Sequence, residues 1–521
     1  MSDRANPRTN FVAARLKRKL TGIFGSDLRS LAAFRIGIAI LILLDLGDRT
    51  RDLRAHYTDW GVVPRAALID LFLDPGCFSF HFMNGTWQWQ LMLFVLAGLC
   101  ALGLLVGYHT RIMTVISWLL LVSLQNRNPL VLQGGDILLR MSLFWAIFLP
   151  LGARSSFDRW LTSTEIPCRE TEARSILTWA TVAVITQPLL VYIFAGIQKT
   201  GPEWTEDNTA VYYAMSVDQL TTPLGQRLLE YPELMRVLTY LALRIELFVP
   251  LLFLMPIFTG FFRTVAFVVL FGMQMGFAAT IRIYLFPWTC VCATLPMLPS
   301  AFWNKLSQAD HPWSRSVAHS ASGCMRSFST LLRQGALPSP RVTSSRWLNI
   351  LAAFFLVYVL LWNLGTLPTS LTSERLEFPR TLRWIAPVLR IDQHWDMFAP
   401  SPLKDDGWYV IPGILLDGTT VDVFRQRASV TWTKPQLVAY TYENQRWQKY
   451  MMNLWSRDFS AFREFYGKYL CRSWNEAHNG QKQLDHFEIY FMREDTLPNR
   501  EAPPEKVLLW EHYCFNVPGD E

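Results

Sequence analysis

Apolar runs separated by polar loops recur along most of the chain and predict helices that cross a membrane. A helix needs about 20 predominantly apolar residues to span the hydrocarbon core of a bilayer. Nine stretches are candidates: Leu31–Leu46, Gln90–Tyr108, Arg111–Ser123, Ile137–Gly152, Ser175–Trp204, Arg236–Thr259, Phe261–Thr280, Tyr284–Trp303 and Trp347–Leu367. The pattern therefore predicts an all-α polytopic membrane bundle of nine transmembrane helices.

Polar stretches divide this bundle from the rest of the chain. Residues 1–29 form a basic tail without an apolar core long enough for a cleavable signal peptide. Residues 30–303 hold the first eight spans, and 304–346, rich in Ser and Arg, are predicted to be a loop. After the last span at 347–367, residues 369–521 have the composition of a soluble domain.

The last part of the chain has the patterns of a small α+β domain. Trp408–Ile414 and Thr420–Phe424 alternate like strands and flank an Asp-Gly dipeptide, which is typical of a hairpin turn. Phe487–Met492 resembles another strand, and Phe459–Trp474 has its aromatic residues at helical spacing. We expect this domain to close over one face of the membrane bundle.

Composition agrees with a membrane protein. Hydrophobic residues make up 51% of the 521 residues and charged residues only 17%, so the class of ordinary soluble proteins is excluded. The net charge of +7 is assigned to loops beside the bilayer, because no basic module that reads bases is visible. The sequence thus predicts the lipid bilayer as a partner, no nucleic acid and no metal site.

The distribution of basic residues predicts the orientation. With nine spans, the tail and the loops after spans four and eight fall on one side. These three regions contain Arg15, Lys17, Arg18, Lys19, Arg29, Arg154, Arg159, Arg169, Arg174, Lys305, Arg315, Arg326, Arg333, Arg341 and Arg346. The positive-inside rule makes that side the cytoplasm and places the C-terminal domain outside. An oxidising space there permits a disulfide that involves Cys471 or Cys514. If the hairpin at residues 280–284 is re-entrant, the C-terminal domain changes sides.

Lys199 is the main candidate for chemistry. It follows more than twenty residues without a charge, with Gly196 before it and Gly201 and Pro202 after it. One interpretation is a lysine that extends its ammonium group to the lipid headgroups. In the other, Lys199 faces the bundle, where desolvation favours a neutral amine that acts as a base.

Further polar groups lie at the predicted membrane depth, in the stretch Ser123–Asp136 and within spans. Irregular polar backbone at this depth requires contact with protein or with a water-filled cavity, although a plain turn between helices is an equal alternative for that stretch. The candidates for substrate or cofactor binding are Asn126, Arg127, Asn128, Gly134, Gly135, Arg35 and Glu246, with Asp136 as a second catalytic candidate.

Several motifs in this order resemble the HTTM family, the horizontally transferred transmembrane domain shared with vitamin K-dependent gamma-carboxylase. They are FRIGIAILILLDLGDR, HYTDWGVVPR, NRNPLVLQGGD with FLPLGARSSFDRW, YIFAGIQKTGPEW and LFPWTCVCATLPMLP, within residues 28–303. The later stretch QHWDMFAPSPLKDDGWYVIPGILLDGTTVDVF resembles the extension of bacterial members. The resemblance implies a multi-pass protein of the bacterial inner membrane, with a cytoplasmic N-terminus and a periplasmic C-terminal domain.

The resemblance also implies a chemistry. In the carboxylase, a lysine after an FAG motif deprotonates vitamin K hydroquinone, and Lys199 in YIFAGIQK matches that lysine. A reduced, vitamin K-like quinone is therefore the expected cofactor, with Asp136 or Glu246 orienting Lys199 or receiving its proton. A cross-link in the carboxylase implies that Cys77 pairs with Cys471 or Cys514, although these two could equally pair with each other.

Two departures from the carboxylase limit what the resemblance implies. Asp136 stands about where the carboxylase has a histidine, and a second histidine is replaced near Gln274. Glutamate carboxylation is therefore not carried over. A carboxylase-like, quinol-dependent enzyme of the lyase class and a non-catalytic membrane factor for peptide maturation or export both stay open, each with a peptide or protein partner. A transporter is a weaker third alternative, since no inverted repeat is visible.

Overall fold

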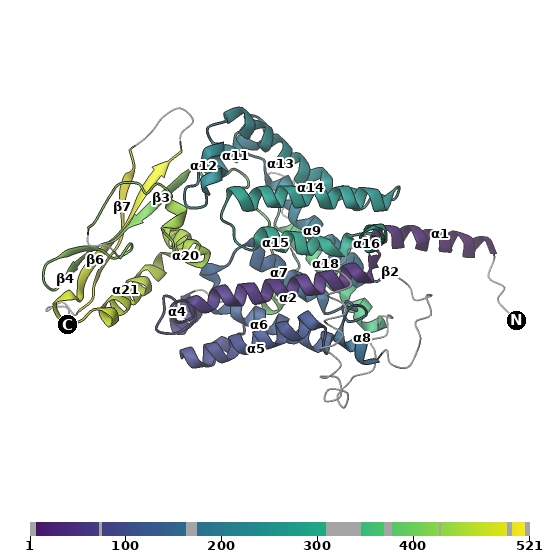
Figure 1. The fold of residues 1–521 in the computed structure, drawn as a ribbon, viewed down its shortest axis with the longest axis horizontal. Helices are drawn as coiled ribbons and strands as arrows, with labels where there is room; N and C mark the ends of the chain where they lie inside the picture. Colours follow the sequence, from purple (N-terminus) through teal and green to yellow (C-terminus); the bar gives the residue numbers. More distant parts are fainter. Residues whose placement is uncertain are drawn as a thin grey trace.

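The structure is a computed structural model that describes residues 7–71, 76–162, 175–308, 345–368, 378–426, 429–496 and 503–515. Helices form an elongated body, and a β-sheet lies at one end of it (Figure 1). Helix α1 (Pro7–Phe24) extends from the opposite end. The first helix and the sheet therefore lie at opposite ends of the helical body.

Five helices among the described residues are long and apolar enough to cross a membrane. They are α2 (Leu28–Arg51), α5 (Trp87–Val106), α9 (Trp179–Gln198), α14 (Thr259–Thr280) and α18 (Arg346–Gly365). The predicted count of nine spans is therefore not confirmed, while the prediction of a helical membrane bundle agrees with these five helices.

The other predicted spans are shorter or more polar in the structure. They correspond to α6 (Thr110–Arg127), α7 (Gly134–Ala146), α13 (Pro232–Leu252) and, for Tyr284–Trp303, the pieces α15 (Phe286–Thr294), η3 (Leu295–Met297) and α16 (Ser300–Gln308). Prolines explain the last division, because Pro296 and Pro299 lack the N–H that continues a helix. At 1.5 Å per residue, α7 and α15 are too short to span a bilayer alone.

Helix α9 contains the Lys199 motif and is the most enclosed of the five long helices. Thr178 caps its start by accepting a hydrogen bond from the N–H of Thr181. The helix ends at Gln198, and Lys199 is its C-cap residue. Three short helices follow it and lie near the C-terminal sheet: α10 (Pro202–Thr205), α11 (Ala210–Ser216) and α12 (Pro223–Leu228).

The remaining short elements connect the long helices. They are β1 (Ser26–Asp27), α3 (Leu53–Tyr57), α4 (Arg65–Leu71), η1 (Phe80–Phe82), η2 (Pro129–Val131), α8 (Phe157–Thr162), β2 (Ser175–Ile176), η5 (Arg380–Leu382) and α19 (Ile385–Leu389). Strands β1 and β2 pair antiparallel and bring the start of α2 beside the start of α9.

The C-terminal domain, residues 405–515, is a five-stranded antiparallel sheet with helices. Its elements are β3 (Asp405–Val410), β4 (Pro412–Leu415), β5 (Thr420–Asp422), η6 (Val438–Tyr440), α20 (Gln445–Trp455), η7 (Arg457–Phe462), α21 (Arg463–Ala477), η8 (Gly480–Lys482), β6 (Leu484–Asp495) and β7 (Glu505–Tyr513). The long strand β6 pairs with β3, β4 and β7. The predicted hairpin is confirmed as β4–β5, with Gly418 in the left-handed conformation at its turn.

The core of the membrane helices and the core of the C-terminal domain both include residues from distant parts of the chain. Phe378 and Trp395, which follow the predicted last span, pack in the core of the membrane helices. Val62 and Leu130, which come long before that span in the sequence, pack in the core of the sheet. Helix α20 lies between the sheet and the helical body (Figure 1).

A disulfide closes the C-terminal domain. Cys471 on α21 is bonded to Cys514 after β7, with a distance of 5.3 Å between their Cα atoms. Of the alternatives that the sequence left open, the structure has this pair. Cys77 lies outside the bond, and its Sγ is 3.9 Å from the carbonyl oxygen of Pro387.

Candidate functional site

A cavity of about 260 Å³ lies where the membrane helices meet the C-terminal domain. Its wall combines residues from α9 to α11, α13 to α15 and α20. Most of its lining is apolar, as shown by Val211, Met215, Phe277, Ile281, Phe286 and Met452. A concave, largely apolar site with a few polar groups is typical of small-molecule binding.

Lys199 and Glu246 form a buried ion pair in the wall of this cavity. The ammonium of Lys199 donates to Oε2 of Glu246 on α13, and the two residues are only 4% and 5% exposed. The Nζ atom also lies 4.8 Å from the ring centroid of Trp204 on α10, a cation–π contact. The side chain of Lys199 thus faces the protein interior, as the second interpretation of the sequence required.

A glycine permits the approach of the two helices that carry this pair. A Cβ atom added at Gly196 on α9 would lie 2.8 Å from Cδ2 and 3.0 Å from Cγ of Leu247 on α13. A side chain at this position would therefore displace that of Leu247, so glycine favours the close contact of α9 with α13.

The pair changes the chemical role expected for the lysine. A carboxylate in contact with an amine stabilises its ammonium form. The sequence argument required a desolvated, neutral amine, whereas the structure places a carboxylate directly against Lys199. Lys199 and Glu246 are therefore considered together, as one buried ion pair in the cavity wall.

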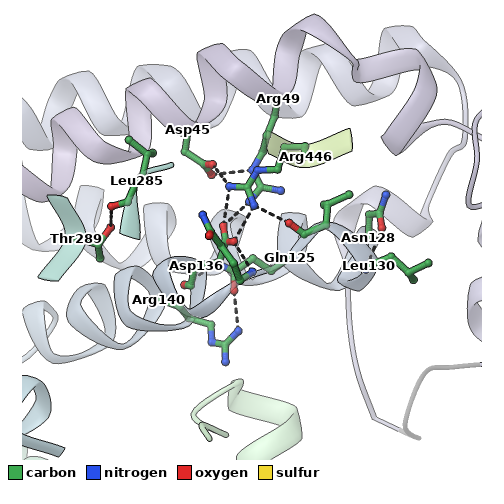
Figure 2. Close-up of polar contacts among 12 residues, drawn as sticks. Asp45, Arg49, Gln125, Asn128, Leu130, Asp136, Arg140, Leu285, Thr289 and Arg446 are labelled. Atoms are coloured by element: carbon green, nitrogen blue, oxygen red, sulfur yellow. Dashed lines mark hydrogen bonds and ion pairs between the residues drawn. The ribbon is translucent and has the colours of Figure 1, made fainter. Parts of the chain in front are cut away.

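Asp136 belongs to a different cluster, which joins the membrane helices to α20. Nη2 of Arg49 lies 2.5 Å from Oδ1 of Asp136, and Nη1 of Arg446 lies 2.7 Å from Oδ2 (Figure 2). The same two arginines bind Asp45, with distances of 2.7 Å from Arg49 Nε and 2.5 Å from Arg446 Nη2. We call Asp45, Arg49, Asp136 and Arg446 the buried quartet.

Charge within the buried quartet balances, since two carboxylates face two guanidinium groups. All four residues are buried, and Arg49 also donates to the hydroxyl oxygen of Tyr57 at 2.6 Å. Buried charges of this kind persist only when they are paired and hydrogen-bonded. The backbone N–H of Gln133 completes the surroundings of Asp136, at 2.9 Å from Oδ2.

These contacts correct the expectation for Asp136. Both of its carboxylate oxygens accept hydrogen bonds from arginines, and Asp136 is not among the residues that line the cavity. Its role in the structure is to hold α20 against α2 and α7. Orienting Lys199 belongs to Glu246 instead.

The polar stretch before Asp136 shapes the same end of the bundle through backbone contacts. Arg127 donates to the carbonyl oxygens of Val63 at 2.8 Å and Thr58 at 2.9 Å. Asn128 donates to the carbonyl of His56 at 3.0 Å, and Asn126 to that of Phe78 at 2.7 Å. These three side chains therefore fix loops. They do not line the cavity.

The other predicted binding residues divide between the cavity and the opposite end. Gly134 lines the cavity, and a Cβ added at Gly135 would lie 3.0 Å from Cα of Phe286, so α7 and α15 pack closely. Arg35 lies far along α2, where it donates to the carbonyls of Leu151 and Ser155. Arg35 is therefore not part of this site.

Sequence reasoning missed the residues that α20 contributes. Gln445, Gln448 and Lys449 line the cavity, and Arg446 between them belongs to the buried quartet. Polar residues at i, i+3 and i+4 share one face of a helix. The available signal in the sequence was the run of polar side chains on this helix. Their contact partners lie over 200 residues away in the chain, so the sequence did not show what these side chains contact.

Among the residues that the structure describes, no group of three or more His, Cys, Asp or Glu side chains is arranged to hold a metal ion. The family model of the HTTM domain matches residues 25–303 of this chain. No curated protein and no solved structure matches the chain.

Proposed function

Because the chain belongs to the HTTM domain family, a family of membrane proteins, we propose that it is a membrane enzyme whose Lys199–Glu246 pair takes a proton from a hydroxyl group of an amphipathic ligand. One observation carries this proposal. An ion pair that is almost completely buried lies in the wall of a mostly apolar cavity. Buried titratable pairs in cavities are typical of functional sites.

A reduced quinone is the ligand class that we propose first. The resemblance to vitamin K-dependent gamma-carboxylase suggests it, and the cavity fits it in character. Aromatic and aliphatic side chains such as Phe277 and Phe286 would cover an apolar ring, and Lys199 lies beside them as the proton acceptor. Such a group, when bound, supplies an acidic aromatic hydroxyl and two electrons.

The chain's own residues account for the proton transfer. Inside the pair, the ammonium of Lys199 can pass a proton to Glu246, which leaves an amine and a carboxylic acid. The amine then takes the hydroxyl proton: the ligand O–H bond breaks and an N–H bond forms. The regenerated ammonium lies beside the new oxyanion, and its cation–π contact with Trp204 helps to hold it in place.

The largely apolar wall of the cavity strengthens these interactions. Helix α20 contributes one part of this wall, and Met397 and Phe398, which follow the last long helix, contribute another. Electrostatic interactions are stronger in such a site than in water, because the surrounding dielectric is low. The C-terminal domain is therefore part of the proposed site.

Replacement of Lys199 by Arg tests the proposal. Arg retains the positive charge but does not release its proton at physiological pH. We expect Lys199→Arg to fold and to lose at least about 100-fold of the rate at which the purified protein, in air-saturated buffer with dioxygen as the electron acceptor, oxidises an added reduced naphthoquinone, a typical contribution of a general base. Glu246→Gln, which removes the carboxylate that accepts the proton of the Lys199 ammonium, is expected to reduce that rate as well.

Lys468→Arg serves as the control, because Lys468 is an exposed lysine on α21 paired with Glu464. Mass spectrometry of small molecules that co-purify with the wild-type protein identifies the ligand directly. Full activity of Lys199→Arg, together with rescue of cells that lack the native protein, would contradict the enzymatic proposal. It would favour the non-catalytic role in peptide maturation or export.

A further inference from the structure

The side of the cavity formed by α20 has polar groups that the proton chemistry does not use. Gln445 and Gln448 are buried, and each has a side-chain Oε1 atom without a hydrogen-bond partner among the described residues. Gln448 is held in place by its own amide nitrogen, which donates to the carbonyl oxygen of Gln219. Burying a hydrogen-bond acceptor without a donor costs free energy, so we expect a donor from outside the chain at each of these oxygens.

Lys449 adds the complementary group on the same face of α20. Its ammonium forms no hydrogen bond or ion pair with the residues that the structure describes, although it lines the cavity. Burial lowers the pKa of Lys449, and the charge of Asp396 opposes that shift. Asp396 itself is 3.2 Å from Nε2 of His394, so it has another partner. Lys449 is thus a donor that lacks an acceptor.

The remaining surroundings indicate an amphipathic ligand. Arg282 adds a second cationic side chain to the cavity wall, over the ring of Tyr440 at 4.5 Å. Thr280, the last residue of the long apolar helix α14, also lines the cavity. The polar groups therefore lie at the end of a predicted membrane span, which is the depth of lipid headgroups.

We propose that Gln445, Gln448 and Lys449 form a binding site for the headgroup of an anionic lipid that carries both a phosphate and free hydroxyl groups. Lys449, assisted by Arg282, binds the phosphate, and the two glutamine oxygens accept hydrogen bonds from the hydroxyl groups. The apolar wall accommodates the start of the acyl chains. This site goes beyond the proposed proton transfer and uses different polar groups of the same cavity, because Lys199 and Glu246 take no part in it.

Lipid binding to the purified full-length protein tests this site. The protein is stripped of lipid in a neutral detergent and titrated with phosphatidylglycerol, and native mass spectrometry measures the bound fraction. We expect Lys449→Met to weaken binding at least about tenfold, the effect of losing one hydrogen bond to a charged group. Lys449→Arg is expected to retain binding, and Lys468→Met on the exposed face of α21 is expected to leave it unchanged.

Three further titrations separate the features of the headgroup. Phosphatidylcholine, which lacks hydroxyl groups and net charge, is expected to bind weakly. The double variant Gln445→Leu/Gln448→Leu is expected to lose the preference for phosphatidylglycerol over phosphatidic acid, which lacks the glycerol hydroxyls. Soluble glycerol 1-phosphate is expected to compete poorly, because it has no acyl chains.

Equal binding of phosphatidylglycerol by the wild type and Lys449→Met would overturn the site, as would equal binding of phosphatidylcholine. Effective competition by glycerol 1-phosphate would show that a soluble phosphate is the ligand and that the lipid is not. Lys199→Arg should bind the lipid like the wild type. A loss of quinol oxidation in Lys199→Arg therefore tests the proposed function, and a failure of lipid binding in Lys449→Met tests the lipid site.

Discussion

Asp406, at the start of the C-terminal sheet, is a carboxyl group that is buried beside another carboxylate. Its Oδ2 accepts a hydrogen bond from the N–H of Gln219 at 3.2 Å. Burial, and secondarily the charge of Asp218, raises the pKa of Asp406 to about 7. Since the ordinary value is 3.8, the folded protein binds this proton more tightly than the unfolded chain does.

This shift predicts how stability depends on pH. The stabilising contribution of the proton is complete below about pH 4 and is lost as the pH rises through about 7. Asp406→Asn stays neutral at every pH, so we expect its melting temperature to exceed that of the wild type by more at pH 8 than at pH 5. Thermal unfolding at both values measures the difference, with exposed Asp70→Asn as the control. A constant difference would contradict the shifted pKa.

At the residue scale, the sequence identified the two residues of the ion pair in the cavity but not the polar residues of α20. Lys199 and Glu246 were both candidates, because charges within long apolar runs need partners. Their contact could not be predicted, since it depends on how α9 packs against α13. Asp136 was a candidate because it lies in the irregular polar stretch and matches the position of a carboxylase histidine, but its partner Arg446 lies in a domain whose position the apolar pattern does not determine.

At the element scale, helix α20 is attached to the membrane helices through Arg446. This side chain forms ion pairs with Asp45 on α2 and Asp136 on α7, and it donates to the carbonyl of Val131 at 2.7 Å. The neighbouring residues of α20 form one wall of the cavity. One arginine therefore positions several groups of the candidate site.

Loss of this arginine is expected to release α20. Arg446→Met leaves the two aspartates with Arg49 alone, and removing one partner of a buried pair costs about 3–5 kcal/mol. We expect faster hydrogen exchange of the α20 amides and a lower melting temperature, with exposed Arg457→Met as the control. Arg446→Met/Asp45→Asn, which restores neutrality, is expected to recover part of the loss. Unchanged exchange in Arg446→Met would contradict this role.

The elements that the sequence predicted well are those with strong local patterns. The long apolar helices and the Asp-Gly hairpin follow from residues near one another in the chain. By contrast, the predicted strand Trp408–Ile414 is divided between β3 and β4, because each of these strands pairs with a different part of β6. Strand β7 was not predicted at all, since its pairing with β6 decides its conformation.

At the scale of the whole molecule, the question is which side of the membrane each end occupies. Helix α1 and the C-terminal sheet lie at opposite ends of the helical body (Figure 1). The orientation that the basic loops give these two ends stays a prediction. The residues 309–344, which include the most basic of those loops, lie outside the described residues.

Reporter fusions test the orientation. We expect a reporter after Trp313 to be active in the cytoplasm and a reporter after Glu521 to be active on the opposite side. A fusion after Met1 provides the cytoplasmic reference. If the fusions after Trp313 and Glu521 report the same side, the nine-span count is wrong.

The buried quartet has a consequence for the order in which the protein matures. Arg446 is synthesised long after the helices that contain Asp45, Arg49 and Asp136 have left the ribosome. Until then, two carboxylates share one guanidinium, so the nascent membrane region has an unbalanced negative charge. A chain that stops before this arginine keeps that uncompensated charge, and we expect the helices to pack less tightly around it.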